Sequence, residues 1–157
     1  MDIKISYLSN DVSLTLGELQ MQHNNKPMVI DFWHTKCTRC PAALEKLNDE
    51  CSQHPEILFV SCALSQGTGN KVVAADVACD WDNLTHIWME IEEKEQAKKE
   101  FNFTSVPFYV VVGKDGSIIA SGEPKSVNYM QLIKNFDENT SSNSSGAKPG
   151  LVLDEDF

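Results

Sequence analysis

The sequence has 157 residues, 41% of them hydrophobic and 23% charged, and a formal net charge of −10. A chain of this length can bury one large core without disulfide bonds, and it holds no apolar run near the roughly 20 residues that span a bilayer. This negative charge, without any basic stripe, argues against a nucleic-acid partner, so we expect neither nucleic-acid nor membrane binding.

The first third of the chain predicts two strand–helix units. Alternating apolar residues at 3–5 predict a strand, and residues that recur at near-helical spacing from Val12 onward predict a helix up to the breaker Asn24-Asn25. The β-branched and aromatic run 28–33 (MVIDFW) predicts a buried strand, and residues 42–51 predict a helix with one apolar face.

The middle of the chain predicts a further strand and helix, separated by a segment without a clear pattern. The apolar run 57–64 (ILFVSCAL) is typical of a strand buried in a parallel sheet. Residues 66–89 form an irregular insertion, in which a short helix over 70–80 and a short strand over 85–89 fit the pattern best. Strong helix formers with interleaved Glu and Lys predict a helix over 90–102.

The last predicted elements are a hairpin and a helix. Residues 108–112 and 117–121 flank Asp115-Gly116, a pair that supplies the positive φ values of a tight turn. An amphipathic helix follows over 126–136. Early β–α–β units followed by an antiparallel pair indicate an α/β fold, in which a central mixed sheet carries helices on both faces.

Two regions divide the chain. Residues 1–138 are predicted to form one domain, and residues 139–157 a flexible linker rich in Ser, Asn and Gly with an acidic and hydrophobic tail. The tail sequence LVLDEDF is either a solvated end or a short peptide that docks on a partner or on the protein's own core.

Cys37 and Cys40 stand two residues apart, directly after a predicted strand and at the start of a predicted helix. They could be a redox pair, half of a metal site, or two buried small hydrophobic residues. A zinc site needs four ligands, usually in two close pairs, and the other three cysteines are isolated, so we expect no metal. A helix N-terminus stabilises a thiolate, which favours a redox pair with Cys37 exposed and Cys40 one turn inside the helix.

Two segments resemble the thioredoxin family. The segment VIDFWHTKCTRCP, residues 29–41, is similar to the family's active-site segment. The segment FNFTSVPFYVVVGKDGSIIASG, residues 101–122, is similar to its helix end, Val-Pro turn and hairpin. The resemblance covers about residues 12–136 and implies a thioredoxin-like fold. The spacing between the two segments exceeds that of minimal thioredoxins, as in larger relatives such as tryparedoxins.

The resemblance also implies a role for each matching residue. Cys37 would be the nucleophile and Cys40 the resolving thiol, and the two would form the redox disulfide. Asp31 would be a buried acid beneath Cys40 that moves its proton. Pro107 would be a cis-proline facing the disulfide, and Val106 would offer backbone hydrogen bonds to an extended substrate.

Two residues of the first segment have an ordinary alternative role. A carboxylate within an apolar strand has its pKa raised by desolvation, which suits Asp31 to act as a base near neutral pH, although it could also be a strand-end carboxylate with hydrogen-bond partners. Trp33 is grouped with Val106 and Pro107 at the substrate-binding site, although packing beneath the site is the more ordinary role for this residue.

The active-site segment departs from the family in its charges. Lys36 replaces the usual tryptophan, Thr38-Arg39 replaces the usual Gly-Pro, and His34 adds a third group that can be cationic. Positive charge near a thiol favours its ionised form, so these groups are expected to lower the pKa of Cys37. A stabilised thiolate favours the reduced protein, which predicts a pair more oxidising than ordinary thioredoxin.

The sequence therefore predicts a protein-disulfide oxidoreductase of thioredoxin-like fold that needs no cofactor. Its predicted partners are proteins with disulfides and a thiol reductant, and it is expected to be a monomer. The polar start of the chain and the odd number of cysteines, five, predict an intracellular, cytoplasmic protein. The alternative is a thioredoxin-like binding or assembly module with little redox activity.

Overall fold

The central strand of the fold is β3 (Met28–Trp33), the apolar run that precedes the cysteine pair, and all six of its residues are buried. The computed structural model describes residues 1–67 and 71–141. Within them β3 belongs to a seven-stranded sheet in the order β2-β1-β5-β4-β3-β6-β7. The other strands are β1 (Lys4–Tyr7), β2 (Ser13–Thr15), β4 (Leu58–Leu64), β5 (Thr85–Met89), β6 (Phe108–Val112) and β7 (Ile118–Gly122).

The sheet is mixed, as the sequence predicts. Strands β3, β4 and β5 are parallel, whereas β6 pairs antiparallel with β3, and β1 pairs antiparallel with β5. Strands β7 and β2 form the two edges, each antiparallel to its neighbour. The carboxyl ends of β3, β4 and β5 therefore meet at one edge of the molecule, where the chain after β3 carries the cysteine pair.

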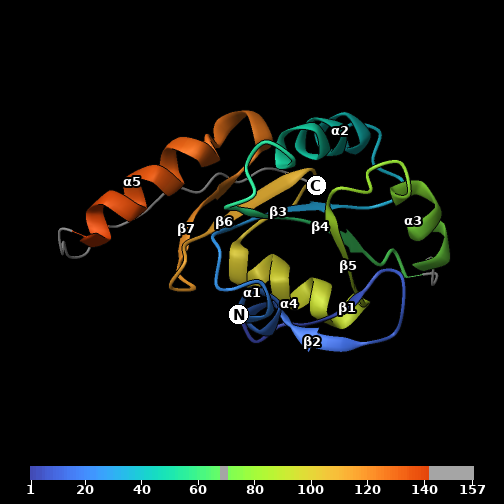
Figure 1. Ribbon diagram of the computed structural model, residues 1–157. Helices are drawn as coiled ribbons and strands as arrows, with labels where there is room; N and C mark the ends of the chain where they lie inside the picture. The colour runs from blue at the N-terminus through green and yellow to red at the C-terminus, as the bar shows by residue number, and fades with distance from the viewer. Residues whose placement is uncertain (68–70, 142–157) are drawn as a thin grey trace.

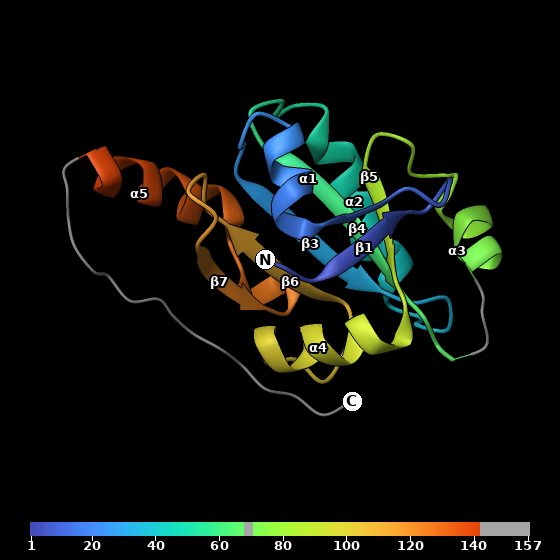
Figure 2. The same ribbon diagram turned by 90° about the horizontal axis from the view of Figure 1, so that it is seen from below.

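Helices cover both faces of this sheet. Figure 1 shows α2 and α5 above the sheet and α1 and α4 below it, and Figure 2 presents the lower face with α4 and α1 in front. The helices are α1 (Leu16–Gln22), α2 (Cys40–Cys51), α3 (Lys71–Ala78), α4 (Ile91–Phe101) and α5 (Tyr129–Ser141), with a 3₁₀ turn at Pro124–Ser126. Within the described part of the chain, no helix has the length and apolar character needed to cross a membrane.

Aromatic side chains pack on both faces of the sheet. Below it, the ring of Phe103 stacks on Phe32 and on Phe108, with ring centroids 4.9 and 4.8 Å apart. Above it, Tyr129 of α5 packs edge-on against Phe59 of β4, with centroids 5.6 Å apart. Offset and edge-on ring pairs stabilise the fold beyond the contribution of the apolar area that they bury. The pair of Tyr129 and Phe59 also fixes how α5 sits on the central strands.

Three regions of the fold differ from the prediction, apart from shifts of a few residues at the ends of other elements. The segment expected to open the first helix contains β2, because Ser13–Thr15 pairs with β1, and Val12 before it is 57% exposed. The turn between β6 and β7 is longer than a two-residue turn: the Gly113 N–H donates to the Ser117 carbonyl at 2.8 Å, and Gly116 alone within it has positive φ. Helix α5 continues to Ser141, so residues 139–141 are not linker, and the rest of the predicted linker and tail, 142–157, lies outside the described residues.

Candidate active site

Cys37 and Cys40 form a disulfide, with their Cα atoms 5.5 Å apart. Cys37 is half-buried and Cys40 is fully buried. Helix α2 begins at Cys40 itself, with Arg39 as its N-cap residue and Pro41 in its first turn. The prediction that Cys40 lies one turn inside the helix is therefore wrong. Cys37 lies in the turn before the helix, where its N–H donates to the His34 carbonyl at 3.2 Å.

The loop before β6 forms a wall beside this disulfide. The peptide bond between Val106 and Pro107 is cis, and both residues are buried. The Val106 carbonyl oxygen lies 3.7 Å from Cys37 Sγ and 3.4 Å from Arg39 Nη2, which donates to it. The sulfur of a disulfide carries no hydrogen, so its approach is a packing contact, but a reduced Cys37 thiol at this place could donate to the same oxygen.

Asp31 lies in the middle of β3, opposite Ser61 of β4 and Tyr109 of β6. Its side chain is fully buried, and neither carboxylate oxygen has a hydrogen-bond partner among the described residues. The alternative of a strand-end carboxylate with hydrogen-bond partners is therefore wrong. Burial without a partner raises the pKa of Asp31 well above its ordinary value, and burial, together with the Asp31 charge, raises the pKa of Tyr109.

Trp33 is part of a buried chain of hydrogen bonds rather than of a binding surface. Its side chain is 1% exposed, so the predicted contact with substrate is wrong, and packing beneath the site is what the structure shows. Trp33 Nε1–H donates to Ser61 Oγ at 3.0 Å, and Ser61 Oγ lies 2.7 Å from His86 Nδ1. His86 Nε2 lies 2.6 Å from the Trp81 carbonyl oxygen.

The donor and the acceptor of each hydrogen bond in this series follow from the Trp33 N–H at one end and the Trp81 carbonyl at the other. A carbonyl oxygen can only accept, so His86 carries its proton on Nε2, and its Nδ1 accepts from the Ser61 hydroxyl. Burial is the main cause that lowers the pKa of His86, which favours this neutral form. No pattern along the sequence predicts these hydrogen bonds, because Ser61 and His86 meet only through the register of β4 and β5.

Changing Ser61 to alanine should lower the free energy of unfolding by about 2–4 kcal/mol, because it leaves both Trp33 Nε1–H and His86 Nδ1 buried without a partner. Urea denaturation of the variant and the wild type measures the effect. Ser52→Ala, an exposed serine just after α2, is the control and should change stability little. A loss below about 0.5 kcal/mol for Ser61→Ala would show that these hydrogen bonds contribute nothing to stability.

His34 differs from the prediction in its charge. Burial lowers its pKa below the ordinary value, and the nearby positive charges of Lys94 and Lys36 lower it further. Its Nδ1 accepts the Lys36 N–H at 3.2 Å, which fits the neutral ring. His34 therefore adds no positive charge beside the disulfide at neutral pH, and Lys36 and Arg39, both exposed, are the predicted cationic groups that remain.

Lys94 is a cation near the site that sequence reasoning missed. It lies on α4 and is only 9% exposed, and its Nζ donates to the Ser65 carbonyl at 3.0 Å and to Gln66 Oε1 at 3.3 Å. Burial is the main cause that lowers its pKa. The Glu and Lys residues around it read as a solvated helix face, so the sequence held no signal for its burial.

The remaining cysteines are free thiols outside the site. Cys62 is fully buried, and burial raises its pKa well above the ordinary value. Cys51 is half-buried with its Sγ 3.3 Å from the Asn83 carbonyl oxygen, and burial raises its pKa too. Cys79 is exposed. No group of three or more His, Cys, Asp or Glu side chains within the described ranges could hold a metal ion.

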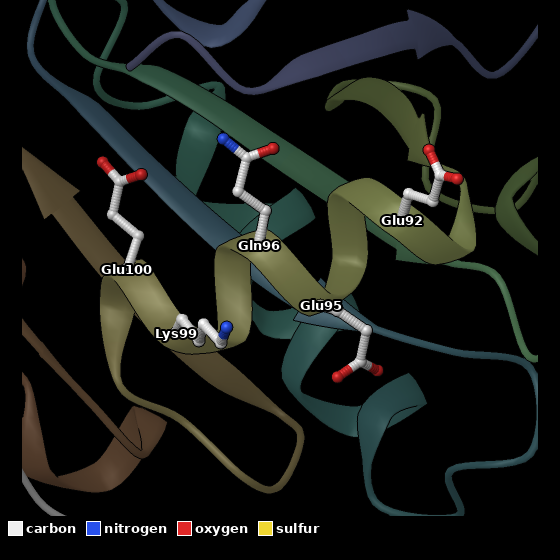
Figure 3. Close-up of a pocket in the computed structure, with 5 residues that line it drawn as sticks. All are labelled: Glu92, Glu95, Gln96, Lys99 and Glu100. Atoms are coloured by element: carbon white, nitrogen blue, oxygen red, sulfur yellow. The ribbon is translucent and has the colours of Figure 1, made fainter.

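A surface depression lies along α4, and neither cysteine of the disulfide lines it. Figure 3 shows the five side chains that line it, all from this one helix: Glu92, Glu95, Gln96, Lys99 and Glu100. Three carboxylates and one ammonium on an open helix face are typical of a solvated surface, so we assign no function to it.

Comparisons with known proteins agree with this architecture. A family model described as thioredoxin-like matches residues 24–118. The structure of MTB DsbF in mixed oxidised and reduced forms is 17% identical, with a TM-score of 0.64 over 87% of this chain and 94% of that one. A secreted Mycobacterium tuberculosis disulfide oxidoreductase homologous to E. coli DsbE is 18% identical, with a TM-score of 0.62 over 87% and 96%.

A third similar structure comes from another organism. The thioredoxin domain of a thiol-disulfide oxidoreductase from Bacteroides vulgatus is 12% identical, with a TM-score of 0.66 over 87% of this chain and 91% of that one. No curated protein sequence matches this chain. At identities of 12–18%, the similar structures establish the fold alone, and the chemistry depends on the side chains of this chain.

Proposed function

Because this chain belongs to the thioredoxin-like family, we propose that it is a thiol–disulfide oxidoreductase that exchanges disulfides with protein partners. The observation that carries the proposal is the Cys37–Cys40 disulfide, in which one sulfur belongs to a half-buried residue and the other to a fully buried one. Two of the similar structures support it, one of a secreted disulfide oxidoreductase homologous to E. coli DsbE and one of the thioredoxin domain of a thiol-disulfide oxidoreductase.

The reaction needs only the two sulfurs and a proton acceptor. In the reduced protein the Cys37 thiolate attacks a substrate disulfide, a mixed disulfide forms, and the substrate's other sulfur leaves as a thiolate that takes up a proton. Cys40 then loses its proton and attacks Cys37 Sγ, which forms the internal disulfide and releases the second substrate thiolate. The substrate gains two electrons and the protein loses them, and a thiol reductant restores the dithiol.

We assign the proton transfer in the second step to Asp31. A carboxyl with a raised pKa is a stronger base than an exposed one, and its pKa lies closer to that of a thiol. Asp31 is the buried carboxylate of the strand that leads into the cysteine pair. The carboxylate accepts the proton of Cys40 as its sulfur attacks, and it returns the proton to solvent or to the leaving thiolate.

Turnover of a protein disulfide, such as that of insulin with dithiothreitol as reductant, tests the proposal. The wild type should accelerate the reduction, and the double variant Cys37→Ser/Cys40→Ser should not exceed the uncatalysed rate. Equal rates for the two proteins would contradict the proposal and would favour the alternative, a thioredoxin-like binding or assembly module.

We further propose that the pair is more oxidising than ordinary thioredoxin by several tens of millivolts. Lys36 and Arg39 lie beside Cys37 in sequence, and positive charge stabilises the thiolate of the reduced form, by about 30 mV for each unit of pKa. Equilibration with glutathione buffers measures the potential, and Lys36→Ala should lower it, unlike Lys46→Ala on the exposed face of α2. A wild-type potential at or below roughly −270 mV, the thioredoxin value, would refute this.

We also propose that the protein acts as a monomer inside the cell, on protein disulfides and without a cofactor. Three free thiols beside a single disulfide support a reducing compartment, although one similar structure is of a secreted protein. Size-exclusion chromatography coupled to light scattering tests the oligomeric state, and a fluorescent fusion tests the location.

A further inference from the structure

We propose that Arg39 is a specificity-determining residue that selects substrates in which a carboxylate lies next to the disulfide. The inference rests on the proposed thiol–disulfide exchange and names the substrate class for it. Arg39 is the only arginine of the sequence, in a chain that otherwise uses lysine for its positive charges, and it lies between the two cysteines of the disulfide.

The structure holds the Arg39 guanidinium beside the sulfur that a substrate must reach. Arg39 Nη2 lies 3.4 Å from the Val106 carbonyl oxygen, and Cys37 Sγ lies 3.7 Å from the same oxygen. A substrate disulfide that reacts with Cys37 has to bring its sulfur to bonding distance. The residues that flank its cysteine then arrive next to the guanidinium.

Arg39 has donors to spare at this place. A guanidinium carries five N–H donors, and the bond to Val106 uses one of its nitrogens. Arg39 forms no ion pair with any carboxylate in the described part of the chain, although acidic residues outnumber basic ones by 23 to 13 in the sequence. An exposed guanidinium that is fixed at one end and unpaired at the other fits a carboxylate supplied by a second molecule.

The fork geometry separates Arg39 from the lysines nearby. A guanidinium binds a carboxylate through two parallel N–H bonds, whereas an ammonium acts as a compact point charge. The Lys94 ammonium, whose charge acts on His34, is buried and is already engaged by Ser65 and Gln66. Lys36 is exposed and adds to the positive charge near the disulfide. Of Lys36 and Arg39, it is Arg39 that the Val106 carbonyl holds in place.

Single-turnover reduction of two peptide disulfides tests the inference. Each substrate is a disulfide-linked dimer of one peptide, with Glu beside the cysteine in one and Gln in the other. Pre-reduced protein is mixed with each dimer, and the rate constant for release of the peptide thiol is measured by mass spectrometry. The ratio of the Glu to the Gln rate, divided by the same ratio with dithiothreitol, removes the intrinsic effect of Glu on the peptide thiol.

The wild type should prefer the Glu peptide by about fivefold at low salt, as expected for a charge-assisted bond at a partly exposed site. Arg39→Gln should bring the normalised ratio to about one, and Arg39→Lys should lose most of the preference because it keeps the charge but not the fork. Lys46→Gln, the control on the exposed face of α2, should keep the wild-type ratio. A change in redox potential or in overall rate affects both peptides alike, so it leaves this ratio unchanged.

The outcomes separate this inference from the function on which it rests. Reduction of both peptides by the wild type at equal normalised rates would overturn the role of Arg39 and leave the proposed exchange intact. A preference that Arg39→Gln retains would do the same. Reduction of neither peptide would overturn the proposed exchange, and the inference with it.

Discussion

Changing Cys40 to serine should hold substrates on the protein as covalent mixed disulfides, whereas changing Cys37 to serine should leave no adduct, and both variants should lose turnover. Cys37 is the half-buried member of the pair and Cys40 is fully buried, so only Cys37 can meet a substrate sulfur first. Without Cys40 the second attack cannot occur, and the mixed disulfide lasts until an outside thiol releases it.

Electrophoresis under non-reducing conditions, with and without dithiothreitol, measures the adducts. Both variants are best made in a Cys79→Ser background, because Cys79 is an exposed free thiol that could form adducts of its own. Abundant adducts with Cys37→Ser would show that the order of the two sulfurs is reversed. Identification of the proteins captured by Cys40→Ser would also name the physiological substrates.

Changing Asp31 to alanine should make the protein more stable at neutral pH and slower in turnover. The folded state raises the pKa of Asp31 through burial, so between the unfolded pKa, near 3.9, and the folded pKa the native state binds more protons than the unfolded state. The stability of the wild type therefore falls as pH rises through that window. The variant lacks this loss.

The expected difference between variant and wild type grows by about 1.4 kcal/mol for each pH unit within the window, and it is constant above the folded pKa. Urea denaturation at a series of pH values from 4 to 8 measures it. Asp115 is a control of opposite sign: hydrogen bonds from Ser117 lower its pKa, so Asp115→Ala should lose stability above the unfolded pKa. If the difference in stability between Asp31→Ala and the wild type did not change with pH, ionisation of the buried Asp31 carboxyl would not destabilise the fold.

The turnover of Asp31→Ala should fall by about 10²-fold or more where release of the proton from Cys40 limits the rate. An uncompensated buried acid that weakens the fold is hard to explain by structure alone. A gain in stability together with a loss of activity would support a role in proton transfer. Unchanged turnover would remove Asp31 from the mechanism.

The sequence predicted best those elements whose residues are buried on both sides. The runs at β3, β4 and β6 are continuous and apolar, so their boundaries follow from composition alone. The short strand β2 could not be found in this way. It carries only one buried residue and exists because it pairs with β1.

The candidate site was predictable where one segment holds the chemistry and not where several segments meet. The cysteine pair and Asp31 lie within ten residues of one another, so spacing and a resemblance placed them. The burial of Trp33, the neutral His34 and the buried Lys94 depend on the packing of β4, β5 and α4 around the end of β3. No pattern along the chain encodes those contacts.

The chain of bonds from Trp33 to Trp81 ties the insertion between β4 and α4 to the strand that precedes the cysteines. At its other end the insertion is held by Lys71, whose Nζ donates to Ser6 Oγ and to the Asn10 carbonyl. Hydrogen bonds therefore attach this segment to the rest of the fold at both ends. Shortening the segment should weaken the packing beneath the disulfide. Substitutions on its exposed face, where Val72 is 74% exposed, should change stability little.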